Sequence, residues 1–113
     1  MIKGIGVDII EIHRIQKAVE RWGDDFLNHV FTPDEITHAK KFKFPFAHYA
    51  GRFAAKEAVF KALGDSSISW QDLNITNDVS GMPHCACLKT NNKILLSISH
   101  SRDYAVAQAI VTA

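Results

Sequence analysis

The sequence predicts an α+β fold, in which a small antiparallel β-sheet packs with one long helix and two or three shorter helices. After one strand-like segment, the first two thirds of the chain repeat their apolar residues at helical spacing, whereas the last third alternates apolar and polar residues. Of the 113 residues, 47% are hydrophobic. This length and composition fit a single domain, residues 1–113, with one modest core.

The net charge argues against two classes of partner. The chain has thirteen Lys and Arg residues and twelve Asp and Glu residues, which gives a formal charge of +1. Such a chain has no overall field to hold nucleic acid or an anionic membrane, so an anionic ligand must meet a local patch. Lys3 and Asp8 interrupt the first apolar run, and no later run approaches the ~18 residues of a membrane span. We therefore expect a cytoplasmic protein without nucleic-acid or membrane partners.

The segment from Ile2 to Asp8 alternates and predicts the first strand. Its apolar side chains share one side: Ile5, Val7 and Ile9. Gly4, Gly6 and Asp8 lie on the other side, where we expect the glycines to leave open space beside Asp8. A backbone segment or a ligand phosphate could approach closely there.

Two helices are expected next. Apolar residues at helical spacing predict a helix from about Glu11 to Trp22, which Gly23 should end in a left-handed cap. Thr32 can cap a second, short helix, and Glu35 can complete its capping box. This second helix should run to about Phe42.

The remaining elements are one long helix and four short strands. Helical spacing extends from Phe46 to Leu63, and Gly64 is placed to end that helix. The strand-like runs that follow are Leu73 to Thr76, Cys85 to Lys89, Ile94 to His100 and Tyr104 to Val111. Turn residues separate these runs, so consecutive antiparallel hairpins are the simplest topology.

Cys85 and Cys87 are the only cysteines of the chain. Their side chains would lie on one face of a strand, which is a poor arrangement for a disulfide between them. We expect free thiols that pack against the sheet, in a reducing compartment. No second cysteine pair is present to complete a zinc site.

Glu57 is the most informative residue of the long helix. It falls one turn from Phe53 and Phe60, in an apolar stripe where a carboxylate is out of place. A buried charge needs a counter-charge, and a hard divalent cation with oxygen ligands is one candidate. The alternative is an ordinary pair with Lys61, four residues further along a partly exposed face.

Asp8 has two possible roles as well. An aspartate between a strand and a helix often caps the helix that follows. Together with Glu57 it could instead supply two carboxylates to Mg²⁺, which usually completes its coordination sphere with water and substrate phosphates.

Cationic residues surround Glu57 in the sequence and predict a local site for compact phosphates. The cations on the long helix are Arg52, Lys56 and Lys61, and those just before it are Lys40, Lys41, Lys43 and His48. The alternative is a solvated charged face, with the interleaved phenylalanines in the core. His100 ends a strand at the edge of a hairpin, where it could donate to a phosphate or merely satisfy the turn.

Four separated motifs, in this order, resemble the holo-[acyl-carrier-protein] synthase family of phosphopantetheinyl transferases. They are Gly4-Ile5-Gly6-Val7-Asp8-Ile9, Phe31-Thr32-Pro33-Asp34-Glu35, Gly51-Arg52-Phe53-Ala54-Ala55-Lys56-Glu57-Ala58 and Ser97-Ile98-Ser99-His100-Ser101. The resemblance implies a Mg²⁺-dependent enzyme of fatty acid biosynthesis. Such an enzyme moves the 4′-phosphopantetheine of coenzyme A to a serine of apo-acyl carrier protein and releases adenosine 3′,5′-bisphosphate.

The same resemblance implies roles for individual residues and a homotrimer with sites between neighbouring subunits. Asp8 and Glu57 match the metal-binding acids, and Lys61 matches the lysine near the pyrophosphate. The positions near the coenzyme A phosphates and nucleotide are Arg52, His100, Lys40, Lys41 and the turn with Gly81 and Pro83. Arg14 and Arg21 match the basic positions that dock the carrier protein. A rival interpretation is a non-catalytic module that binds coenzyme A or a related nucleotide, for which the basic patch alone would suffice.

Overall fold

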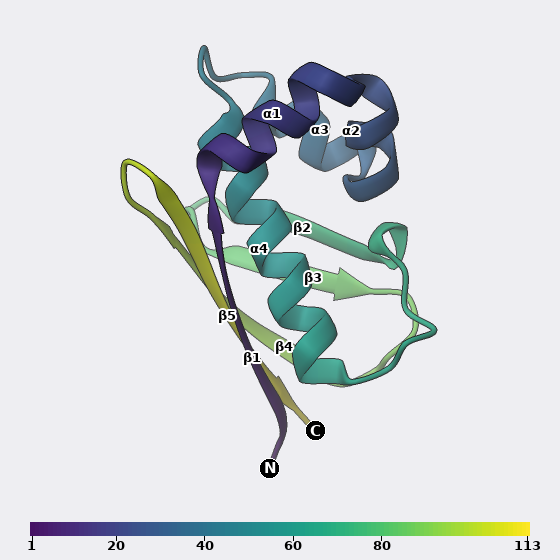
Figure 1. Ribbon diagram of the computed structural model, residues 1–113. Coiled ribbons are helices and arrows are strands. Elements are labelled where there is room, and N and C mark those ends of the chain that lie inside the picture. Colours follow the sequence, from purple (N-terminus) through teal and green to yellow (C-terminus); the bar gives the residue numbers. More distant parts are fainter.

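The computed structural model describes residues 1–113, and in it the long helix α4 (Phe46–Leu63) crosses one face of an antiparallel sheet (Figure 1). Three short helices cover one end of α4: α1 (Ile12–Trp22), α2 (Asp24–Val30) and α3 (Pro33–Ala39). The remaining elements are β1 (Ile2–Glu11), the 3₁₀ turn η1 (Trp70–Asp72), β2 (Leu73–Asn77), β3 (Pro83–Cys87), β4 (Lys93–His100) and β5 (Tyr104–Thr112). The predicted α+β fold is confirmed.

The strands form two antiparallel sheets rather than the one that the sequence predicted. The larger sheet has the order β1-β5-β4, and β2 and β3 form a separate hairpin. The predicted pairing of neighbouring strands is right for β2 with β3 and for β4 with β5, while β1 returns from the start of the chain to pair with β5. β3 packs beside β4 without a hydrogen-bonded ladder, and this gap divides the expected sheet.

The predicted ends of α4 are confirmed, and those of α3 only in part. α4 ends at Gly64, whose φ of 64° is left-handed. Thr32 and Glu35 form the predicted capping box, in which the Glu35 carboxylate accepts from the Thr32 N–H at 2.8 Å. α3 ends at Ala39 instead of about Phe42, because Lys41 and Phe42 donate to carbonyls three residues back and tighten the chain into a turn. None of the helices is both long enough and apolar enough to cross a membrane.

Gly23 joins α1 directly to α2, a helix that the sequence did not predict. The Gly23 N–H donates to the Val19 carbonyl at 2.8 Å, and the Gly23 carbonyl accepts from Leu27 at 3.2 Å. Its φ of 55° is positive as expected, but its ψ of −131° lies outside the left-handed helical region. A single glycine therefore ends one helix and begins the next, and the predicted left-handed cap is wrong.

The glycine side of β1 holds the backbone of α4 rather than open space. A Cβ added at Gly4 would overlap the Ala62 carbonyl oxygen, and one at Gly6 would overlap that of Ala58. The predicted close approach of backbone is thus confirmed, whereas the predicted open space is wrong. The larger side chains of β1 consequently face outward, and Ile5 and Val7 are 63% and 56% exposed.

A buried ion pair joins α4 to the rest of the helical layer. Lys56 Nζ lies 2.8 Å from Glu35 Oε1, and both side chains are fully buried. Lys56 also donates to the carbonyls of Val30 and Trp70 at 2.8 and 2.9 Å. Glu35 in turn accepts from the Ile75 N–H at 2.7 Å. The prediction that Lys56 belongs to a phosphate site is wrong, because all of its contacts lie inside the core.

The two cysteines are free thiols, as predicted. Both lie on β3 and pack against the larger core cluster. Burial raises the pKa of Cys85 to about 12, so this thiol stays protonated at neutral pH.

Gly6→Ala tests the close approach of β1 to α4. We expect it to lower the free energy of unfolding by about 3 kcal/mol, because the added methyl meets a helix carbonyl that cannot move by itself. Gly51→Ala is the matched control, since its methyl meets only Ile98 Cγ2, at 3.1 Å. Urea denaturation at one fixed protein concentration compares them, and equal losses from the two variants would contradict the packing argument.

Candidate functional site

Asp8 and Lys61 meet where β1 crosses the last turn of α4. Lys61 Nζ lies 3.2 Å from Asp8 Oδ1 and donates to the Val7 carbonyl at 2.9 Å. Asp8 caps no helix, because β1 continues to Glu11, the residue before α1. The alternative role of Asp8 as a helix cap is therefore wrong.

Glu57 lies half-buried beside this pair. Burial, and secondly the negative charge of Asp8, raise the pKa of Glu57, while Lys61 opposes the shift. Lys61 forms its ion pair with Asp8, so the alternative pair of Glu57 with Lys61 is not formed. Phe53 and Phe60 pack on Trp70 and are themselves partly exposed, so Glu57 lies at the margin of the buried face rather than within it.

The chemistry of these residues fits Mg²⁺. Asp8 and Glu57 bring two carboxylates close enough for one charge to disfavour ionisation of the other, and a bound cation would relieve that cost. The chain contains no group of three or more His, Cys, Asp or Glu residues that could hold a metal. The protein would thus contribute two oxygen ligands, the number typical of Mg²⁺ sites that also bind substrate phosphates.

Arg52 lies on the opposite flank of α4. It lies five positions before Glu57, which turns it about 140° around the helix axis. Arg52 Nη2 donates to Asn77 Oδ1 at 3.2 Å, at the end of β2. The sequence placed Arg52 around Glu57, but in the structure Asn77 holds Arg52, and the charged groups that act on Glu57 are Asp8 and Lys61.

Other predicted nucleotide-binding residues gather on the Arg52 flank. His100 at the end of β4 lies 6.3 Å from His48 of α4, measured between ring centroids. The β2–β3 turn continues from Asn77 and contains Gly81, which has a φ of 88°, and Pro83, which begins β3. Asp78 shapes this turn by accepting from the N–H groups of Ser80 and Met82 at 2.9 and 3.1 Å.

The other predicted basic residues are exposed. Lys40 and Lys41 follow α3, and Lys41 is close enough to lower the pKa of His38, after burial and Arg52. Arg14 and Arg21 lie on α1, where the Arg21 guanidinium stands 4.9 Å from the centre of the Trp22 ring. Neither arginine forms an ion pair with Asp8, whose partner is Lys61.

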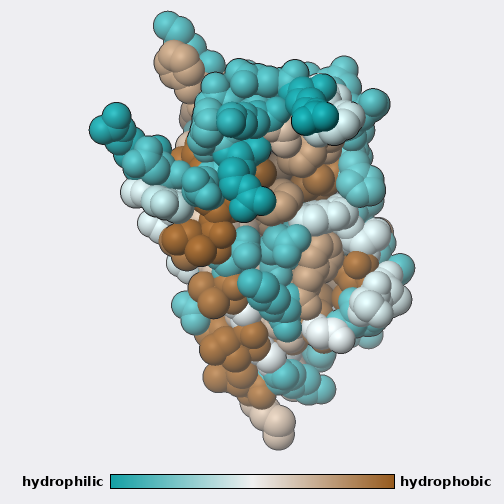
Figure 2. Space-filling model, viewed as in Figure 1, coloured by the Kyte–Doolittle hydropathy of each residue, from teal (hydrophilic) through white to brown (hydrophobic).

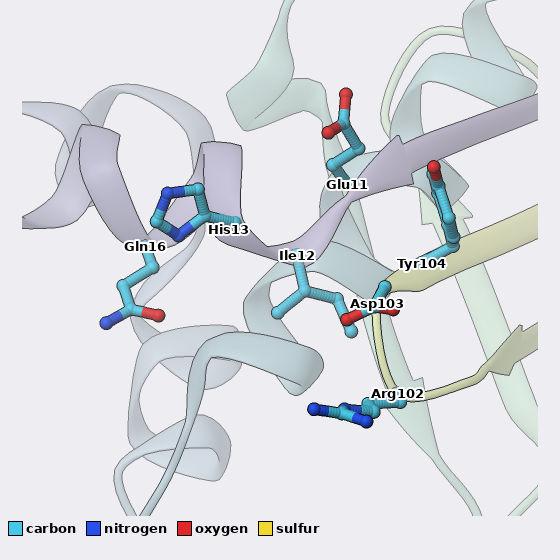
Figure 3. Close-up of a pocket in the computed structure, with 7 residues that line it drawn as sticks. All are labelled: Glu11, Ile12, His13, Gln16, Arg102, Asp103 and Tyr104. Atoms are coloured by element: carbon cyan, nitrogen blue, oxygen red, sulfur yellow. The ribbon is translucent and has the colours of Figure 1, made fainter.

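The largest depression of the surface involves none of the predicted site residues. It measures about 400 Å³ at the junction of β1 with α1 and is lined by Glu11, Ile12, His13, Gln16, Arg102, Asp103 and Tyr104. Figure 3 shows the Glu11 and Tyr104 side chains pointing away from Arg102. The polar groups therefore do not converge on one ligand, and the depression is not a candidate active site.

Comparison with known protein families tests the resemblance found in the sequence. A sequence model of the 4′-phosphopantetheinyl transferase superfamily matches residues 4–109. The chain belongs to this superfamily. The match runs from β1 to β5 and so includes both flanks of α4.

Curated relatives and solved structures of the superfamily cover nearly the whole chain. Holo-[acyl-carrier-protein] synthase of Protochlamydia amoebophila is 48% identical over 97% of this chain and 98% of its own. The structure of the synthase from Bacillus anthracis in complex with CoA (3′,5′-ADP) has a TM-score of 0.90 and 40% identity, and covers 100% of this chain and 99% of its own. The coenzyme A complex of the Helicobacter pylori synthase has a TM-score of 0.87 and 33% identity, with 96% and 99% coverage. The resemblance to the holo-[acyl-carrier-protein] synthases is confirmed.

Sequence reasoning missed His38 and Asn77. His38 lies 6.0 Å from His48 between ring centroids, and Asn77 holds Arg52. No local pattern marks either residue, because His38 on α3 and Asn77 on β2 meet residues of α4 only in the folded chain. The capping box at Thr32 was the only sequence pattern that predicted the start of α3, the helix that carries His38.

Replacing Asp8 by asparagine tests the proximity of the two acids. We expect Asp8→Asn to lower the pKa of Glu57, because the variant removes a nearby negative charge and frees Lys61. Carbon-detected NMR titration of the Glu57 carboxyl measures the change. Asp25→Asn, on the exposed start of α2, is the control and should leave that pKa where it is. An unchanged Glu57 pKa in Asp8→Asn would show that the two carboxylates do not interact.

Proposed function

We propose that this protein transfers the 4′-phosphopantetheine of coenzyme A to a serine of apo-acyl carrier protein, releasing adenosine 3′,5′-bisphosphate, in fatty acid biosynthesis. The observation that carries the proposal is the half-buried Glu57 beside Asp8 at the β1–α4 contact, where burial first and then the charge of Asp8 raise its pKa. Two adjacent carboxylates with a lysine suit pyrophosphate chemistry, and the synthases named above supply the reaction.

In this proposal Asp8 and Glu57 hold Mg²⁺. The ion supplies charge neutralisation to the pyrophosphate oxygens when bound. Lys61, already held beside Asp8 at 3.2 Å, offsets the negative charge that develops on the leaving phosphate.

The serine hydroxyl oxygen forms a bond to the phosphorus on the pantetheine side of the pyrophosphate. The bond between that phosphorus and the bridging oxygen breaks, and adenosine 3′,5′-bisphosphate leaves with the electron pair. Glu57 accepts the serine proton. Glu57 is the preferred acceptor because it lies beside Asp8 and Lys61, where the proposal places the pyrophosphate.

The nucleotide part of coenzyme A is assigned to the Arg52 flank. Arg52, His100, Lys40 and Lys41 bind its phosphate groups there, and the turn with Gly81 and Pro83 lies against the nucleotide. The bond between Arg52 and Asn77 supports this assignment, because it ties the phosphate-binding arginine to the strand from which that turn extends.

Arg14 and Arg21 are assigned to docking of the carrier protein. Both lie exposed on α1, and an acidic carrier protein would meet their positive charge. The reaction takes place in the cytoplasm, where Cys85 and Cys87 remain reduced.

The protein acts as a homotrimer with active sites between subunits. Asp8 and Arg52 lie on opposite flanks of α4, so one coenzyme A molecule would meet the acids of one subunit and the cations of its neighbour. The outer face of the three-stranded sheet offers the contact surface, since its large apolar side chains are uncovered: Ile5, Val7, Ile9 and Leu95. Figure 2 shows this apolar strip in brown along β1. Such a patch is typical of a subunit interface.

Intact mass of apo-acyl carrier protein, after incubation with this protein, coenzyme A and Mg²⁺, tests the reaction. We expect the mass of one phosphopantetheine group to be gained, and no gain when a chelator is present. Asp8→Ala should reduce kcat by about 100-fold or more, because an active-site charge is lost. Asp25→Ala is the control and should match the wild type. Binding of coenzyme A without any mass gain would instead support a non-catalytic binding module.

Co-expression of two inactive variants tests whether subunits share a site. Asp8→Ala and Arg52→Ala damage different flanks, so mixed trimers restore roughly one quarter of the sites if subunits assemble at random. Asp8→Ala with Glu57→Ala is the matched control, because both changes fall on the same flank and no intact site can form. The activity of each purified mixture is compared with that of the wild type. Equal activity in the two mixtures would place the whole site within one subunit.

A further inference from the structure

Three histidines meet beside Arg52, and the proposed function uses only one of them. The His48 ring stacks on Phe42, with centroids 3.6 Å apart and an interplanar angle of 16°. The rings of His38 and His100 lie edge-on to His48 at 6.0 and 6.3 Å. Helix α3, the segment before α4, α4 itself and the end of β4 each contribute one of these rings, so the cluster exists only in the folded chain.

The charged groups that act on this histidine cluster are all cationic. His38, His100 and Arg52 disfavour protonation of His48. Arg52 and Lys41 do the same to His38. No carboxylate acts on either imidazole. The one carboxylate that acts on Arg52 is Glu35, which is already paired with Lys56 in the core.

Arg52 gives an independent indication of a missing anion. Arg52 is 8% exposed, and only its Nη2 has a hydrogen-bond partner, the Asn77 side chain at 3.2 Å. The buried Arg52 Nε has no hydrogen-bond partner. An unpaired buried N–H of a charged group is costly, and an anion beside the cluster would remove that cost.

The imidazoles are poised to respond to such an anion. Burial first, and then the neighbouring cations, lower the pKa of His48 and of His38. Both rings are therefore largely neutral at neutral pH while no anion is bound. A phosphate dianion next to them would reverse the effect of the cations and favour protonation.

We propose that His48 is a specificity-determining residue that selects coenzyme A by its 3′-phosphate, which it binds together with Arg52 and His100 while taking up a proton. The inference rests on the proposed function, which places the pyrophosphate at Asp8 and Glu57 on the other flank of α4. The 3′-phosphate is the remaining phosphate group of coenzyme A and is absent from dephospho-coenzyme A. Phe42 and His38 hold the His48 ring in place.

Titration calorimetry with coenzyme A and with dephospho-coenzyme A tests the role of His48. Buffers of different ionisation enthalpy give the number of protons taken up on binding. We expect His48→Phe, which keeps an aromatic ring for Phe42, to reduce proton uptake with coenzyme A and to weaken its binding about tenfold. Binding of dephospho-coenzyme A should stay unchanged, which also shows that the variant is folded. His29→Gln, exposed at the end of α2, is the control and should match the wild type.

The wild-type protein gives a second test that needs no variant. The ratio of the affinity for coenzyme A to that for dephospho-coenzyme A should rise as pH falls from ~8 to ~6.5, the range in which imidazoles gain charge. A ratio independent of pH, or equal ratios and proton uptake in His48→Phe and the wild type, would overturn the inference. Neither result touches the proposed function, which fails separately if the carrier protein gains no phosphopantetheine.

Discussion

The buried pair of Lys56 and Glu35 is the constraint on which the rest of the structure depends. It joins α4 to α3, and the carbonyls and N–H groups around it bring in α2, η1 and β2. Losing either partner would leave an uncompensated buried charge, which costs about 3–5 kcal/mol in proteins. Because all the hydrogen-bonding groups of Lys56 are used inside the core, this lysine fixes the rotation of α4 about its own axis.

That rotation determines where the chemistry lies. With Lys56 turned into the helical layer and Ala58 against β1, Glu57 and Lys61 emerge on the β1 side of α4. Arg52 lies on the β2 side of α4, where its guanidinium donates a hydrogen bond to the Asn77 side chain. One helix therefore carries two groups of charged side chains that face apart, and the outer face of the three-stranded sheet leaves large apolar side chains uncovered.

The sequence predicted well whatever depends on neighbouring residues. The ends of α4 and the capping box at Thr32 follow from local rules, and Asp8 and Glu57 stood out as carboxylates in apolar or glycine-rich surroundings. The predictions that were wrong concern contacts between distant parts of the chain. Lys56 looks like any helix-surface cation until its partner on α3 is known, and the glycines of β1 indicate a close approach without showing that a helix fills the space.

The protonated state of Cys85 has a consequence for a protein that handles a thiol. Coenzyme A ends in a sulfhydryl group, and a reactive cysteine nearby would exchange with its oxidised forms and become blocked as a mixed disulfide. The attacking species in such exchange is the thiolate, which is nearly absent from Cys85 at neutral pH because its pKa is raised to about 12. Burial of this side chain against the core thus protects Cys85 from covalent capture by the substrate.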